Sequence, residues 1–132
     1  MKKILVSLLV AMVLTACQQT QEQLDLKAAL VNKLKDDSDL KDYKIDPKDL
    51  AECVFNEIAE NAPGIPGDVK RNRYFEAFTK FITVSSPSDA EKAVKDYQDL
   101  FGGVHETHQA ATSVTDHIMS CMGGAVDAAK PQ

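Results

Sequence analysis

The chain has 132 residues, 15 basic against 20 acidic side chains, a formal net charge of −5 and three cysteines. This length suits one domain with a modest hydrophobic core. The acidic balance excludes a general nucleic-acid binder, which needs a basic surface, and the 44% of hydrophobic residues exclude a disordered acidic tail.

The N-terminus has the pattern of a secretory signal. Met1, Lys2 and Lys3 form a basic start, and residues 4–14 are apolar apart from Ser7. A helix of this length spans only about 16 Å, which is too short for the roughly 30 Å hydrocarbon core of a membrane. We therefore expect the segment to direct export and to be removed, rather than to span a membrane.

The residues that follow, Leu14-Thr15-Ala16-Cys17, resemble the lipobox of bacterial lipoproteins: leucine, two small residues and a cysteine. The resemblance implies cleavage before Cys17, which becomes the first mature residue and carries lipid on its sulfur and its amine. Proteins of this type carry three acyl chains, and two or more chains anchor a protein stably on a membrane. Gln18 stands where aspartate favours retention in the inner membrane, so the resemblance implies the outer membrane, on its periplasmic face.

Removal of residues 1–16 takes two of the 15 basic side chains, which leaves 116 residues with 13 basic against 20 acidic side chains, a net charge of −7. Residues 17–23 are expected to form a polar, lipidated tether that reaches at most about 20 Å. The helical domain is predicted to span residues 24–124. Residues 125–132 are predicted to be a flexible tail.

Apolar residues recur at helical spacing in five segments, which predicts an all-α bundle of four or five helices. Asp46-Pro47 and Ser86-Pro87 each combine a capping side chain with a proline at the first helical position. A charged connector is expected at residues 36–44, and Gly123 and Gly124 are expected to cap the last helix. The predicted helices are residues 24–35, 47–61, 69–84, 87–101 and 104–122.

Cys53 and Cys121 remain for the domain once Cys17 carries lipid. Two thiols in an oxidising compartment are expected to pair, which would join the second predicted helix to the fifth. The alternatives are two buried free thiols or a redox-active pair. No Cys-x-x-Cys motif is present, and neither cysteine stands beside a histidine or a basic cluster, so the sequence favours a structural disulfide.

His105 and His108 are the first candidates for a metal site. They are three residues apart, whereas the zinc-protease motif needs histidines four apart. They can share one face of a helix, but His117 falls on roughly the opposite side, so a third ligand must come from another helix. We expect surface histidines and no bound metal; a weak metal site or a pH-responsive patch is the alternative.

The only basic cluster of this acidic chain lies at residues 70–74. It is a candidate surface for anionic lipid headgroups or for an acidic segment of a partner, and the alternative is a solvated helix face. The same helix carries an aromatic stripe, which we expect to belong to the core. The candidate partner-binding residues are Lys70, Arg71, Arg73 and Tyr74, and the stripe contains Phe75, Phe78 and Phe81.

No nucleophile constellation and no phosphate-binding loop is present, so the sequence predicts neither an enzyme nor a cofactor. It favours an anchored module that binds another envelope protein. In lipobox, size and predicted disulfide the chain resembles small helical lipoproteins that assist secretion or envelope assembly, such as secretion pilotins. A binder of a small apolar ligand is the alternative, for which a cavity of several hundred Å³ beside the aromatic helix would argue. An inhibitor or immunity-type protein, marked by carboxylates clustered on one surface, is another.

Overall fold

The computed structural model describes residues 19–130, so the signal segment and the lipobox-like residues lie outside the described part. Along residues 19–130 the chain forms six helices and no strand, which confirms the all-α fold and adds one short helix to the expected number. None of these helices is both long enough and apolar enough to cross a membrane. The helices are α2 (Gln21–Leu34), α3 (Ser38–Tyr43), α4 (Pro47–Glu60), α5 (Val69–Thr83), α6 (Pro87–Phe101) and α7 (Val104–Ala128).

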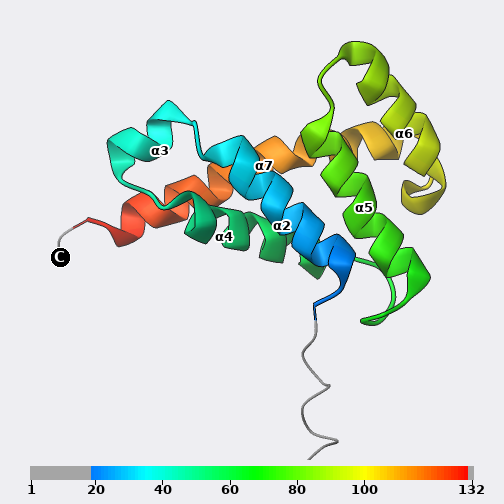
Figure 1. Cartoon of the computed structure of the whole chain (residues 1–132), viewed down its shortest axis with the longest axis horizontal. Coiled ribbons are helices and arrows are strands. Elements are labelled where there is room, and N and C mark those ends of the chain that lie inside the picture. The colour runs from blue at the N-terminus through cyan, green and yellow to red at the C-terminus, as the bar shows by residue number, and fades with distance from the viewer. Residues whose placement is uncertain (1–18, 131–132) are drawn as a thin grey trace, which may run out of the picture.

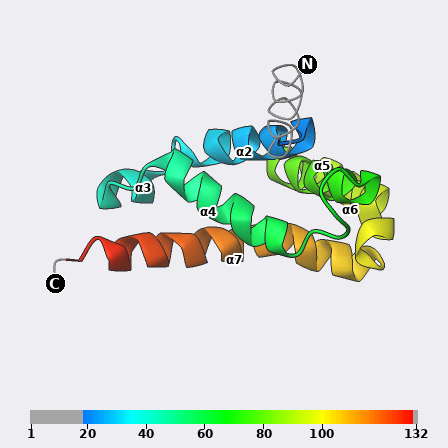
Figure 2. The same cartoon turned by 90° about the horizontal axis from the view of Figure 1, so that it is seen from below.

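The helices pack in layers (Figures 1 and 2). Helix α2 packs against α4 and α5, and α7 packs against α4, α5 and α6. Figure 2 shows α2 and α7 on opposite sides of the molecule, with α4 crossing between them. Helices α4 and α7 run in opposite directions along the chain, and α3 lies at the end of the molecule far from α6. The core therefore lies between α2 and α7.

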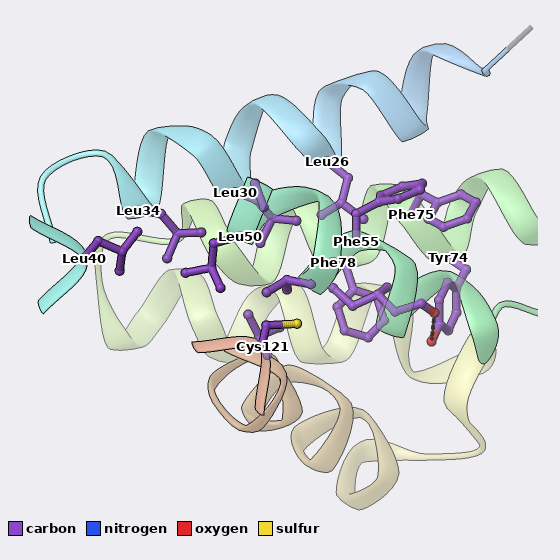
Figure 3. Packing of buried hydrophobic residues seen from close by; sticks show 14 residues of the cluster. Leu26, Leu30, Leu34, Leu40, Leu50, Phe55, Tyr74, Phe75, Phe78 and Cys121 are labelled. Atoms are coloured by element: carbon purple, nitrogen blue, oxygen red, sulfur yellow. Dashed lines mark hydrogen bonds between the residues drawn. The ribbon is translucent and has the colours of Figure 1, made fainter. Parts of the chain in front are cut away.

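The core is one continuous cluster of leucines and aromatic rings (Figure 3). Leu26 and Leu30 of α2 are fully buried, as is Phe75 of α5. Phe75 stacks on Phe55 of α4 with ring centroids 5.6 Å apart. The expectation that the aromatic face of residues 69–84 belongs to the core is confirmed for Phe75 and Phe78, which is 2% exposed.

Helix α2 begins earlier than the sequence predicted. Thr20 caps it: the Gln23 amide donates to Thr20 Oγ1 at 3.4 Å, and the Thr20 amide donates to Gln23 Oε1 at 3.0 Å. This reciprocal pair is a capping box. Residues 21–23 are therefore helical rather than part of a tether, and only Gln18 and Gln19 separate Cys17 from the cap.

The expected charged connector contains a helix, α3. Asp37 caps it by accepting hydrogen bonds from the amides of Asp39 and Leu40 at 2.9 and 3.4 Å. Leu40 is 1% exposed and belongs to the core cluster. One buried leucine in a charged segment gives no periodic pattern, so periodicity could not predict this helix.

The prediction that the last helix ends at residue 122 is wrong. Helix α7 continues through Gly123 and Gly124 to Ala128, so residues 125–128 are helical rather than a flexible tail. Ala125 and Val126 are half-buried, and their packing favours continuation of the helix. Gly102, by contrast, adopts a left-handed conformation with φ +95° and ends α6, as the sequence predicted.

We expect Gly123→Ala to stabilise the protein by about 1 kcal/mol, because glycine is disfavoured by that amount inside a helix. A Cβ at this position meets nothing within 4 Å. Urea unfolding measures the difference. Gly64→Ala is the contrasting control: Gly64 has φ +72°, and its Cβ would lie 2.4 Å from Asp68 Oδ2, so this change should destabilise. Destabilisation by Gly123→Ala would mean that α7 ends at the glycines in solution.

Candidate functional site

A disulfide joins α4 to α7 where the two helices cross. Cys53 and Cys121 are bonded, with sulfurs 2.08 Å and Cα atoms 6.0 Å apart. Cys121 is 5% exposed and belongs to the core cluster, whereas Cys53 lies at the surface. The predicted pairing is confirmed, and the bond connects the early part of the bundle to the late part.

A polar link lies one turn from the disulfide. Glu57 follows Cys53 by four residues and His117 precedes Cys121 by four, so two antiparallel helices bring them together. His117 Nδ1 lies 2.6 Å from Glu57 Oε2. Ser120 Oγ donates a hydrogen bond to Glu57 Oε1 at 3.2 Å. The disulfide and this link together fix the position of α4 relative to α7.

Cys53, Glu57 and Cys121 bring together atoms that could bind a metal, but the two sulfurs are not thiolates. One ligand atom from each of Cys53, Glu57 and Cys121 lies within 4.8 Å of the others. Metals are bound by thiolates, and both sulfurs are held in the disulfide. The Cys121 sulfur is 3.6 Å from Glu57 Oε1, a contact but not a hydrogen bond, because the bonded sulfur carries no hydrogen. In the oxidised protein the cluster therefore joins helices.

A groove of about 420 Å³ opens beside the disulfide, between α4 and the last turns of α7. Its lining combines the apolar side chains of Ile45 and Leu50 with polar side chains and with small residues of α7. Small residues on the α7 side leave room for an apolar side chain from outside. The lining residues are Ile45, Asp49, Leu50, Cys53, Glu57, Ser120, Cys121, Gly124 and Ala125.

Three of the four predicted partner-binding residues make contacts within the domain. Arg71 donates to the carbonyl oxygens of Ala62 at 2.8 Å and of Gly64 at 3.4 Å. Arg73 pairs with an α6 carboxylate, and Tyr74, 7% exposed, donates to a carbonyl of α4. Lys70 is exposed. The residues at 70–74 therefore hold the domain together more than they form a basic surface.

The α5–α6 contact is polar at its edge. Arg73 pairs with Asp99 through both carboxylate oxygens, at 2.7 and 3.2 Å, and this hydrogen bonding lowers the pKa of Asp99. Tyr97 donates to Glu76 at 2.9 Å. Burial, with a smaller contribution from that hydrogen bond, raises the pKa of Tyr97 to about 12. These two side-chain pairs position α6 against α5.

We expect the free energy of unfolding to fall as pH rises from 10 to 12. Burial raises the pKa of Tyr74 to about 12 from its ordinary value of 10.0, and Arg71 opposes the shift. The folded state thus holds this proton more tightly than the unfolded state, so the stabilisation is complete below pH 10 and is lost toward pH 12. Urea unfolding at several alkaline pH values measures the slope. A Tyr74→Phe, Tyr97→Phe double variant should lose most of it, and an undiminished slope there would contradict the explanation.

The two candidate histidines lie apart from these features. His105 and His108 are exposed on the first turns of α7. Among residues 19–130, the cluster at Cys53, Glu57 and Cys121 is the one place where three metal-ligating side chains meet. Within this described range no third metal-ligating side chain joins the histidine pair, and His117 lies against Glu57 instead.

A second hollow, of about 450 Å³, lies beside α5, the helix that carries the aromatic stripe. Tyr74, Phe78 and Phe101 contribute to its lining. These rings already pack against one another, with the Tyr74 centroid 4.9 Å from that of Phe78 and 5.5 Å from that of Phe101. Most of their surface is consequently covered by the protein itself.

Glu57, Ser120 and the groove were not predicted from the sequence. If the disulfide is assumed to join two antiparallel helices, the sequence does indicate the contact between Glu57 and His117. Glu57 lies four residues after Cys53, and His117 lies four residues before Cys121. Comparison of this chain with family models, with curated proteins and with solved structures finds no match.

Proposed function

We propose that this chain is an outer-membrane lipoprotein, anchored on the periplasmic face through lipid on Cys17, that binds another envelope protein and carries out no catalysis. The observation that supports it most is the Cys53–Cys121 disulfide, because structural disulfides occur mainly in exported proteins. Thr20 caps α2 only three residues after Cys17 of the lipobox-like segment. The anchor thus holds a rigid domain close to the membrane.

The groove between α4 and α7 is the surface best suited to a partner protein. Its lining contains both apolar and polar side chains, as protein interfaces do. The disulfide and the Glu57–His117 link hold its walls in place, so binding requires little ordering of this chain. An apolar helix face of the partner fits such a groove.

In-cell photocrosslinking from the lipidated protein tests the proposal. A crosslinking side chain at Ala125, in the groove, should capture one discrete protein, while the same group at the exposed Lys92 of α6 should not. Gly124→Leu fills the groove and should abolish the adduct. Gly123→Leu is the matched control, since Gly123 is exposed and outside the lining. Capture that survives Gly124→Leu, or that is equal from Ala125 and Lys92, would contradict the groove as the binding surface.

A small apolar ligand in the hollow beside Tyr74 and Phe78 is the second candidate. The hollow's volume of about 450 Å³ lies within the range of small-molecule sites. Native mass spectrometry of protein purified from its own membranes tests it. A bound small molecule that Ala110→Phe displaces supports this function, and a ligand-free mass counts against it.

A further inference from the structure

The loop between α4 and α5 holds an apolar side chain out in solvent. Ile65 begins a tight turn in which the Asp68 amide donates to the Ile65 carbonyl at 3.1 Å. Pro66 and Gly67, with φ +89°, occupy the central positions of a type II turn. Ile65 is nevertheless 74% exposed, as is Val69 at the start of α5. The ordered turn and the start of α5 thus expose two apolar side chains to solvent.

Arg71 keeps this loop in place from within. Its guanidinium donates to the carbonyl oxygens of Ala62 and Gly64, on the loop, and of Ala59, near the end of α4 at 3.4 Å. These bonds satisfy carbonyl groups that the end of a helix leaves without partners. The turn is therefore presented in one conformation, and its apolar side chains can meet a surface without a large loss of conformational freedom.

The loop lies at the end of the molecule where α2 begins. Figure 1 shows the α4–α5 loop and the first turn of α2 together at the lower end, and Figure 2 looks onto that end. Leu24, in the first turns of α2, is 45% exposed. Three of the six exposed large hydrophobic residues in the described part of the chain belong to these elements: Leu24 to α2, Ile65 to the α4–α5 loop and Val69 to the start of α5.

We propose that Leu24, Ile65 and Val69 form a membrane-contact surface that rests on the bilayer holding the Cys17 lipid. The inference depends on the proposed function, because it requires that lipid. Cys17 and Thr20 are separated by only Gln18 and Gln19, a span of at most about 10 Å. So short a connection holds this end of the domain at the headgroup region.

The chemistry of this end suits a lipid interface. Apolar side chains at the boundary between headgroups and acyl chains gain by leaving water, typically about 5–10 Å deep. Lys70 is exposed beside Val69 and can meet headgroup phosphates, while Asp68 is engaged as the cap of α5. Ile45, which lines the groove, follows the end of α3 by two residues, and α3 is at the far end of the molecule (Figure 1), so this part of the groove stays accessible to a partner.

A single tryptophan tests the surface, because the chain has none. The full lipidated protein is purified from membranes and placed in vesicles of phosphatidylethanolamine and phosphatidylglycerol with brominated acyl chains. In Ile65→Trp the emission should shift to shorter wavelength and be mostly lost to bromine quenching. Tyr43→Trp is the matched control, since Tyr43 is 59% exposed on α3 at the far end, and its emission should remain.

The outcomes separate this inference from the proposed function. An intact mass without lipid on Cys17 would overturn the anchor, and the membrane-contact surface with it. A lipidated protein in which Ile65→Trp is quenched no more than Tyr43→Trp would overturn the surface alone. That second result is also expected if a partner protein, rather than lipid, covers the Ile65 turn, because these vesicles contain no other protein.

Discussion

Replacing Cys53 and Cys121 together by serine should lower the free energy of unfolding by about 4 kcal/mol. The bond joins residues 68 positions apart, and its removal gives the unfolded chain much more conformational freedom. A domain of this size has a total stability of about 5–15 kcal/mol. The double variant should therefore lose a large part of its stability, and urea titration at 25 °C measures the loss.

Reduction of the unmodified protein is the control for this result. A dithiol reductant should lower its stability by a similar amount and leave the double serine variant unchanged. A loss below about 1 kcal/mol in both cases would contradict the model of loop-closure entropy. It would mean that the Glu57–His117 link and the core hold α4 and α7 together without the bond.

Phe75→Ala should destabilise the domain by about 4 kcal/mol, the usual cost of removing a buried aromatic ring. Phe75 is fully buried, stacks on Phe55 and meets Tyr74 edge-on with centroids 5.9 Å apart. Its ring joins α5 to α4 at the centre of the core, so its loss leaves a cavity. Urea unfolding measures the effect.

Two variants control this prediction. Tyr43→Ala removes an aromatic ring that is 59% exposed and should change stability by no more than about 0.5 kcal/mol. Phe75→Leu keeps an apolar side chain at the site and should cost less than Phe75→Ala. Similar losses for Phe75→Ala and Tyr43→Ala would contradict the placement of α5 at the centre of the core.

The helix starts that rest on local chemistry could be predicted. Asp46 accepts a hydrogen bond from the Lys48 amide at 2.7 Å, and Ser86 accepts one from the Asp89 amide at 3.1 Å. Both caps depend only on residues within one turn, and the sequence displays those residues. Thr20 and Gln23 displayed the same kind of signal, but the polar residues around them carry no apolar periodicity to draw attention to a helix.

The features that depend on distant parts of the chain could not be predicted. Whether α7 passes through its glycines depends on what Ala125 packs against. Arg71 binds carbonyl oxygens that become free only when α4 ends and the loop turns. The groove in turn requires α7 to continue through Gly124 to Ala125, which the sequence pattern argued against.

The candidate site could be predicted from the sequence only in part. Pairing of Cys53 with Cys121 could be predicted from the number of cysteines and the expected compartment, without knowledge of geometry. The Glu57–His117 contact requires the direction of both helices, which the sequence does not state but which the disulfide restricts. The basic residues at 70–74 were visible as a charge pattern, whereas their partners within the domain were not.

The intact mass of the protein from the membrane fraction tests the central claim most directly. The account predicts a chain of 116 residues that begins at Cys17, carries lipid on that residue, and is lighter by two hydrogens because Cys53 and Cys121 are bonded. A protein that begins elsewhere, or one with an unmodified Cys17, would contradict it.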